Sequence, residues 1–281
     1  MKTSVYFWPQ WFKEALNDPR KRKIAPTLIK RLNQTQFYLW QSLNIYDDFL
    51  DGQGQRQKLP LANSYRRRFL TGLYRLNLPT DYYRLGDRLM ADLEAADRAE
   101  VLRPRLKIQK GRLLWPGRWP GFPRPTELSR KSLALALAPL AALSYLGRPV
   151  RSRESRAALD FWRYGLAAKQ LADDARDWEE DLRRGLITAA NLPLLRAAKR
   201  RRLPLDPAAR PEIPRLLFAL SASSLAEQIK SLTAKARQKA AEAGLKPSGR
   251  LLKELLLPLE KAAAETEKFR RLLTGKPEAM L

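Results

Sequence analysis

The 281-residue sequence contains no cysteine and no histidine. Without cysteine the chain has neither a disulfide bond nor a thiolate nucleophile, and without histidine it lacks the commonest general base and zinc ligand. Any metal site must therefore use oxygen ligands, which suit hard cations such as Mg²⁺. Because a Mg²⁺ ion held by carboxylates usually shares its coordination sphere with substrate phosphates, this composition favours diphosphate chemistry.

Long hydrophobic runs are also missing. No stretch approaches about 18 uninterrupted apolar residues, the length that a membrane-spanning helix needs. The first residues, MKTSVYFWPQWFKEALND, contain no apolar run followed by a small-residue cleavage site. These features predict a soluble, cytoplasmic protein.

Acidic residues are few, with 29 Asp and Glu against 54 Lys and Arg, and the formal net charge is +25. Such a charge attracts nucleic acid, anionic lipid or phosphorylated small molecules, and it cannot by itself select among them. Basic runs at 20–23, 66–68 and 199–202 keep open a helical nucleic-acid-binding protein as an alternative of a different class. Runs this dispersed are typical of solvated helix faces, so we expect no nucleic-acid partner. They could equally steer diphosphates or form a peripheral contact with an anionic membrane.

Alternating β-branched runs are almost absent, whereas Leu and Ala recur at helical spacing, so the sequence predicts an all-α protein. Pro and Gly interrupt the pattern in a Trp-rich connection at 113–127, and Pro recurs beside basic residues at 191–214. The length and a hydrophobic content of 44% fit one large helical domain or two small ones, and we take a single domain over 1–281 as the prediction. Helices are expected over 27–51, 62–75, 80–100, 126–147, 154–184, 212–243 and 249–274.

One pattern, Asp-Asp-x-x-Asp, occurs twice, as DDFLD from Asp47 and as DDARD from Asp173. On a helix, the first and last Asp of each copy lie about 6 Å apart on one face. Like charges at this spacing destabilise a helix, most of all near its C-terminal end, unless a cation lies between them. The structural alternatives are a helix cap at 47–51 and ordinary surface ion pairs at 179–184. The predicted catalytic and metal-binding carboxylates are Asp47, Asp48, Asp51, Asp173, Asp174 and Asp177, with Asp181 as a further metal ligand.

With two such motifs on separate predicted helices, the sequence resembles the class I isoprenoid synthase superfamily, in particular the trans-polyprenyl diphosphate synthases. The resemblance is strongest over 34–190. In that family, arginines that bind diphosphate follow the first motif. Here Arg56 occupies the matching place, Gln57 replaces the second arginine, and Lys58 could compensate for it.

Two further family elements lie between and before the motifs. The family's Lys-Thr pair is matched by Lys131-Ser132, and its glutamine ahead of the second motif is matched by Gln170. The N-terminal signature Gly-Gly-Lys-Arg-x-Arg-Pro is poorly matched by PRKRKIAPTL, where Arg22 and Lys23 could serve.

The segment QLADDARDWEEDLRRG also resembles the squalene/phytoene synthases, whose second motif reads Asp-x-x-x-Asp. Asp177 and Asp181 would then be the ligands. That branch has a Tyr-x-x-x-Val-Ala-Gly-x-Val-Gly segment without a counterpart here, and residues 128–147 match the polyprenyl branch better.

The resemblance implies a single-domain terpenoid-synthase bundle with a central active-site cavity, three Mg²⁺ ions and prenyl diphosphate substrates. The implied activity condenses an allylic prenyl diphosphate with isopentenyl diphosphate and releases diphosphate. A head-to-head prenyltransferase, a terpene cyclase and a non-catalytic synthase subunit remain alternatives. Whether the protein forms a homodimer is left open.

Overall fold

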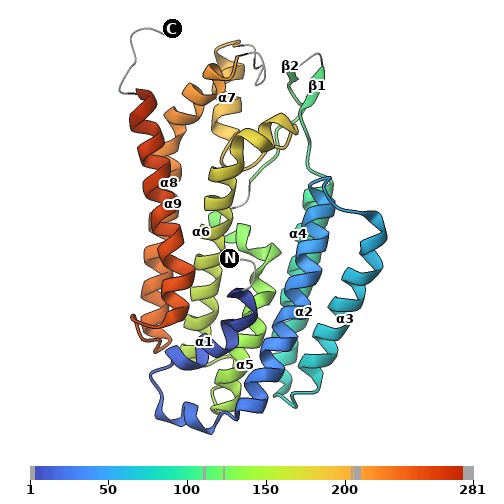
Figure 1. Ribbon diagram of the computed structural model, residues 1–281, viewed down its shortest axis with the longest axis vertical. Helices are drawn as coiled ribbons and strands as arrows, with labels where there is room; N and C mark the ends of the chain where they lie inside the picture. Colours follow the sequence, from blue (N-terminus) through green and yellow to red (C-terminus); the bar gives the residue numbers. More distant parts are fainter. Residues whose placement is uncertain (1–3, 110–111, 123, 204, 206–209, 275–281) are drawn as a thin grey trace. The chain divides into compact units, whose positions relative to one another are not determined.

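Regular spacing of Leu and Ala along the chain produces long helices in the computed structural model (Figure 1), which describes residues 4–109, 112–122, 124–203, 205 and 210–274. The all-α prediction is confirmed, and the sheet that accompanies the helices is a small two-stranded one. None of the described helices is both long and apolar enough to cross a membrane.

Contacts between Cα atoms divide the chain into two compact units. Unit 1 comprises Met1–Val101, Ser129–Tyr164 and Lys235–Leu255. Unit 2 comprises Leu102–Leu128, Gly165–Ala234 and Leu256–Leu281.

Unit 1 is built around α5 (Leu137–Tyr145), whose residues from Leu137 to Leu143 are all buried. Trp8 of α1 packs on Trp162 of α6 with 4.8 Å between ring centroids. α2 and α3 lie side by side, and a Cβ added at Gly72 of α3 would stand 2.6 Å from Thr35 Oγ1 of α2. The other elements with residues in this unit are η1 (Ser4–Phe7), α1 (Trp8–Ala15), η2 (Pro19–Lys23), α2 (Pro26–Leu50), η3 (Arg56–Lys58), α3 (Leu59–Tyr74), α4 (Thr80–Val101), η4 (Pro125–Lys131), η5 (Leu133–Ala136), the first part of α6 (Arg153–Arg183), the end of α8 (Glu212–Glu242) and the start of α9 (Arg250–Thr274).

Unit 2 has an aromatic core in which Trp178 of α6 stacks on Phe218 of α8 at 4.3 Å, and Phe269 of α9 meets Phe218 at 5.8 Å. Its antiparallel hairpin pairs Lys107 with Leu114. The elements here are β1 (Lys107–Gln109), β2 (Arg112–Leu114), α7 (Leu192–Arg200) and parts of α6, of α8 (Glu212–Glu242) and of α9 (Arg250–Thr274).

The helices that carry the two Asp motifs end in the same kind of glycine cap, a Schellman motif. At the end of α2, Gly52 has φ +75°, its N–H donates to Phe49 O at 3.1 Å, and the N–H of Gln53 donates to Asp48 O at 2.9 Å. At the end of α6, Gly185 has φ +72° and the N–H of Leu186 donates to Asp181 O at 2.8 Å. These bonds satisfy carbonyl groups that a helix end would otherwise leave unpaired.

Two predicted segments differ from the structure. The helix expected over 126–147 is divided into η4, η5 and α5, with Ser132 between the first two at φ −128°. The connection expected at 191–214 contains α7. Pro193 does not prevent this helix, because it stands in the first turn, where its missing N–H costs no hydrogen bond.

The turn after α2 gives a matched pair of substitutions. Gly52→Ala introduces only the strain of a positive φ, because no atom lies within 4 Å of the added Cβ, and we expect it to cost about 1 kcal/mol. Gly54→Ala places Cβ 2.5 Å from the backbone N of Phe49, so the turn must open and the cost should be larger. Urea unfolding of both variants checks the order, and equal stabilities would show that the turn is not packed against Phe49.

Candidate functional site

The first Asp motif occupies the last turn of α2. Asp47 and Asp48 are exposed and Asp51 is half-buried, and 57% of the Asp47 side chain is accessible. The glycine cap fixes the direction in which the chain leaves this turn. Because Asp47 and Asp48 are exposed, the motif lies at the surface of unit 1.

Lys131 joins this turn to a distant part of the sequence. Its Nζ lies 2.7 Å from Asp47 Oδ1 and 2.5 Å from Glu100 Oε2, while only 25% of its side chain is accessible. Burial alone would lower the pKa of Lys131, but the two carboxylates outweigh burial and raise it well above its ordinary 10.5. The ammonium is therefore charged at any physiological pH.

A second cation supports the same end of unit 1. Arg66 of α3 is half-buried, with its guanidinium 4.8 Å from the ring centre of Tyr46 and 3.6 Å from Asp97 Oδ2. Burial raises the pKa of Asp97, and the charges of Lys131 and Arg66 act against that rise. Three carboxylates of α4 and one of α2 thus face two cations in a partly desolvated cluster.

The remaining predicted residues of unit 1 are divided between its two ends. Arg56 and Lys58 are exposed in η3, shortly after the Asp motif. The Ser132 hydroxyl, next to Lys131, donates to Ser129 O at 3.4 Å.

Arg22 and Lys23 lie in η2, before the start of α2 at Pro26. Asp47 is 21 residues further along the same straight element, roughly 32 Å at 1.5 Å per residue. Unit 1 therefore does not bring this basic pair to the Asp motif, because a continuous helix separates them.

The second motif lies within α6, ten residues before its end, and draws its partners from the same helix. Asp173 pairs with Lys169 and lies 3.3 Å from Arg176 Nη1. The Gln170 side chain donates to Asp174 Oδ1 at 2.8 Å, so the predicted glutamine does contact the motif.

Asp177 shows the repulsion expected from the spacing. Burial raises the pKa of Asp177, Arg176 opposes the rise, and the negative charges of Asp173 and Glu180 add to it. Asp181, one turn further along, is half-buried and its carbonyl accepts the cap bond from Leu186. A cation near Asp173 and Asp177 would relieve this repulsion.

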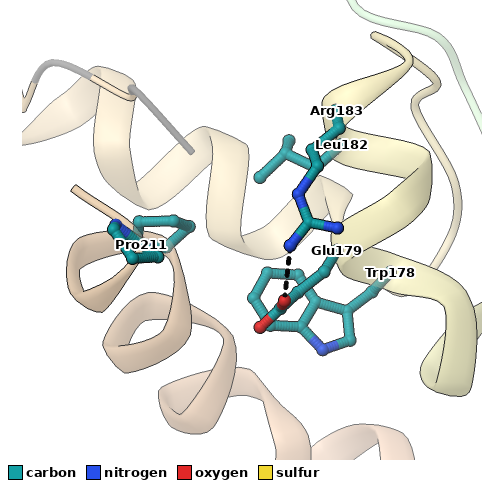
Figure 2. A pocket seen from close by; sticks show the side chains of 6 residues that line it. Trp178, Glu179, Leu182, Arg183 and Pro211 are labelled. Carbon is teal, nitrogen blue, oxygen red and sulfur yellow. Dashed lines mark hydrogen bonds and ion pairs between the residues drawn. The ribbon is translucent and has the colours of Figure 1, made fainter. Parts of the chain in front are cut away.

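A small hollow follows the second motif in unit 2 (Figure 2). Trp178, Glu179, Leu182, Arg183, Pro211 and Pro214 line it. Arg183 Nη2 donates to Glu179 at 3.0 Å, and Arg215 approaches the same carboxylate at 2.7 Å and lowers its pKa. The hollow has room for about one water molecule, far less than a prenyl chain needs.

Among the described residues, no group of three or more Asp or Glu side chains is already arranged around a metal position. No protein-family model matches the chain, and no curated protein matches it significantly.

Sequence reasoning missed the partners that α3 and α4 supply to the first motif. Arg66, Asp97 and Glu100 resemble any other charged positions of two amphipathic helices. Their role depends on tertiary packing, and the only signal along the chain is the three-residue spacing of Glu94, Asp97 and Glu100.

Removing the Lys131 charge should destabilise the protein. Lys131→Met leaves Asp47 and Glu100 without their cation, and we expect a loss of about 1–3 kcal/mol at pH 7, less than for a fully buried pair because Asp47 is exposed. In the wild type the raised pKa keeps the stabilisation complete below the ordinary 10.5 of lysine, and it is lost only at higher pH.

Urea unfolding at several pH values measures this effect, with Lys30→Met at an exposed position of α2 as the matched control. Equal stabilities of the two variants at pH 7 would contradict a role for the Lys131 ion pairs.

Proposed function

We propose that the chain is a Mg²⁺-dependent trans-prenyltransferase that joins an allylic prenyl diphosphate to isopentenyl diphosphate. The observation that supports this most directly is the contact between Lys131 and Asp47, which are 84 residues apart in the sequence. The resemblance assigns one residue to diphosphate binding and the other to metal binding. Their contact in unit 1 is what a shared site requires.

The reaction needs charge rather than a nucleophilic side chain. The allylic carbon–oxygen bond breaks, the diphosphate leaves with the bonding electrons, the double bond of isopentenyl diphosphate forms the new carbon–carbon bond, and a proton is lost. Positive groups aimed at the departing oxygens lower the barrier for such a step. Lys131 is a permanently charged donor at this position, and exposed Arg56 and Lys58 follow the motif.

The residues present fit Mg²⁺. Asp47 and Asp48 are exposed oxygen donors at the end of α2, and Mg²⁺ in phosphate-handling sites usually takes one or two carboxylates, with water and substrate phosphates as its other ligands. A ready-made group of three carboxylates is therefore not needed. When bound, Mg²⁺ would supply Lewis-acid neutralisation of the diphosphate.

The Asp motif of α6 contains the other predicted ligands. Lys169 and Arg176 neutralise Asp173 within the helix, and Gln170 orients Asp174 by a hydrogen bond. Burial and repulsion from Asp173 and Glu180 raise the pKa of Asp177, and a bound cation would oppose that rise. The decisive experiment incubates the purified protein with Mg²⁺, isopentenyl diphosphate and a series of allylic diphosphates, and identifies the products by mass.

Each Asp motif should be needed for turnover. We expect Asp47→Asn and Asp173→Asn each to lower the Mg²⁺-dependent rate by about 10²–10³, the usual loss when one group that stabilises transition-state charge is removed. Asp87→Asn, at an exposed position of α4, is the matched control and should keep the wild-type rate. Circular dichroism checks that the helices remain. Wild-type rates in both motif variants would place the site elsewhere.

The direction of joining is a separate prediction. Because Lys131-Ser132 matches the pair of the polyprenyl branch, we expect consumption of isopentenyl diphosphate and a product one five-carbon unit longer after each cycle. Labelled isopentenyl diphosphate and mass analysis test this. A cyclopropyl product from two identical allylic molecules, without incorporation of label, would instead support head-to-head chemistry.

A further inference from the structure

Two segments of unit 2 carry positive charge without any negative charge. Residues 102–126 contain seven Lys or Arg and no Asp or Glu, and residues 182–205 also contain seven Lys or Arg and no Asp or Glu. The chain as a whole has about one acidic residue for every two basic ones, so these segments are its most one-sided stretches. The first contains the hairpin and the Trp-rich connection, and the second contains α7.

The structure packs these two segments against each other (Figure 1). The N–H of Leu113 in β2 donates to Leu205 O at 3.0 Å, which ties the hairpin to the chain after α7. Lys199, at the end of α7, places its ammonium 5.4 Å from the ring centre of Trp119. The ring centres of Trp119 and Trp115 lie 6.0 Å apart. Two tryptophans and a basic helix end thus form one local surface.

The side chains of this surface are accessible. Arg118 and the four cations Lys199–Arg202 are exposed, Trp115 and Trp119 are half-buried, and Leu114 is 42% exposed. We call Leu114, Trp115, Arg118, Trp119 and Lys199–Arg202 the tryptophan patch. It combines an aliphatic side chain, two indoles and five cations.

We propose that the tryptophan patch docks the protein on an anionic lipid bilayer. Indole rings prefer the level of the lipid headgroups, and each Lys or Arg held near an anionic leaflet strengthens binding about fivefold. The exposed Leu114 has a place in the acyl boundary of a bilayer. A nucleic acid offers Leu114 no comparable apolar layer. Its bases would stack on an open indole face, but Lys199 already lies over the ring of Trp119. This surface does not depend on the proposed enzymatic function.

Flotation of the full-length protein with vesicles tests the proposal. We expect binding to vesicles of phosphatidylcholine mixed with phosphatidylserine, little binding to phosphatidylcholine alone, and weaker binding at high salt. Arg118→Gln, Arg200→Gln and Arg201→Gln combined should weaken binding about a hundredfold. The matched control removes three exposed cations of unit 1 by Lys30→Gln, Arg84→Gln and Arg88→Gln, and it should bind almost as tightly as the wild type.

Brominated lipids test whether the indoles enter the bilayer. They should quench tryptophan emission in the wild type and in Trp40→Phe, and quench it much less in a Trp115→Phe/Trp119→Phe double variant. Equal binding by the two charge variants, or unchanged quenching in the double variant, would overturn the proposal. Binding of a single-stranded oligonucleotide through the same cations, without vesicle binding, would assign the patch to nucleic acid and also overturn it.

Discussion

The ammonium of Lys131, shared between Asp47 and Glu100, is the interaction on which the Asp-bearing end of unit 1 depends. It connects α2, α4 and the segment before α5. No local sequence pattern holds these three elements together. Carboxylates in the last turn of a helix already oppose the helix dipole, so this end needs a cation from elsewhere. Lys131 supplies that cation. A metal ion bound at Asp47 must therefore share this carboxylate with Lys131 or displace it.

The two Asp motifs solve the same charge problem differently because they stand at different depths in their helices. Asp173 lies well inside α6, where residues three and four positions away on either side can pair with it, and Lys169 and Arg176 do so. Asp47 stands three residues before the end of α2, and the residues three and four positions after it are Leu50 and Asp51, which carry no positive charge. Its cation must therefore come through tertiary contact. The glycine caps are alike, whereas the electrostatic support is local in one case and long-range in the other.

The sequence predicted best what depends on local pattern. The expected bounds of α2, α6, α8 and α9 differ from the observed ones by at most one residue at each end, because apolar periodicity and glycine or proline punctuation define these helices. It failed where tertiary contact decides. The helix expected over 126–147 breaks at Ser132, and Glu100 cannot be recognised as a partner of Lys131 from spacing alone. The Asp motifs were visible as patterns, but the exposure of Asp47 and the separation of Arg22 from it follow from packing and helix length.

The excess positive charge has different roles in the two units. In unit 1, Lys131 and Arg66 are committed to carboxylates inside a partly desolvated cluster, where they organise one end of the fold. In unit 2, Lys199–Arg202 project from a helix end in a segment without acidic residues. Exposed charges are screened beyond about 8 Å at physiological salt, so these cations act on whatever they touch rather than on distant ligands. Their neighbours Trp115 and Trp119 then decide the kind of surface they fit, because an indole beside a cation suits a boundary that is apolar on one side and negatively charged on the other.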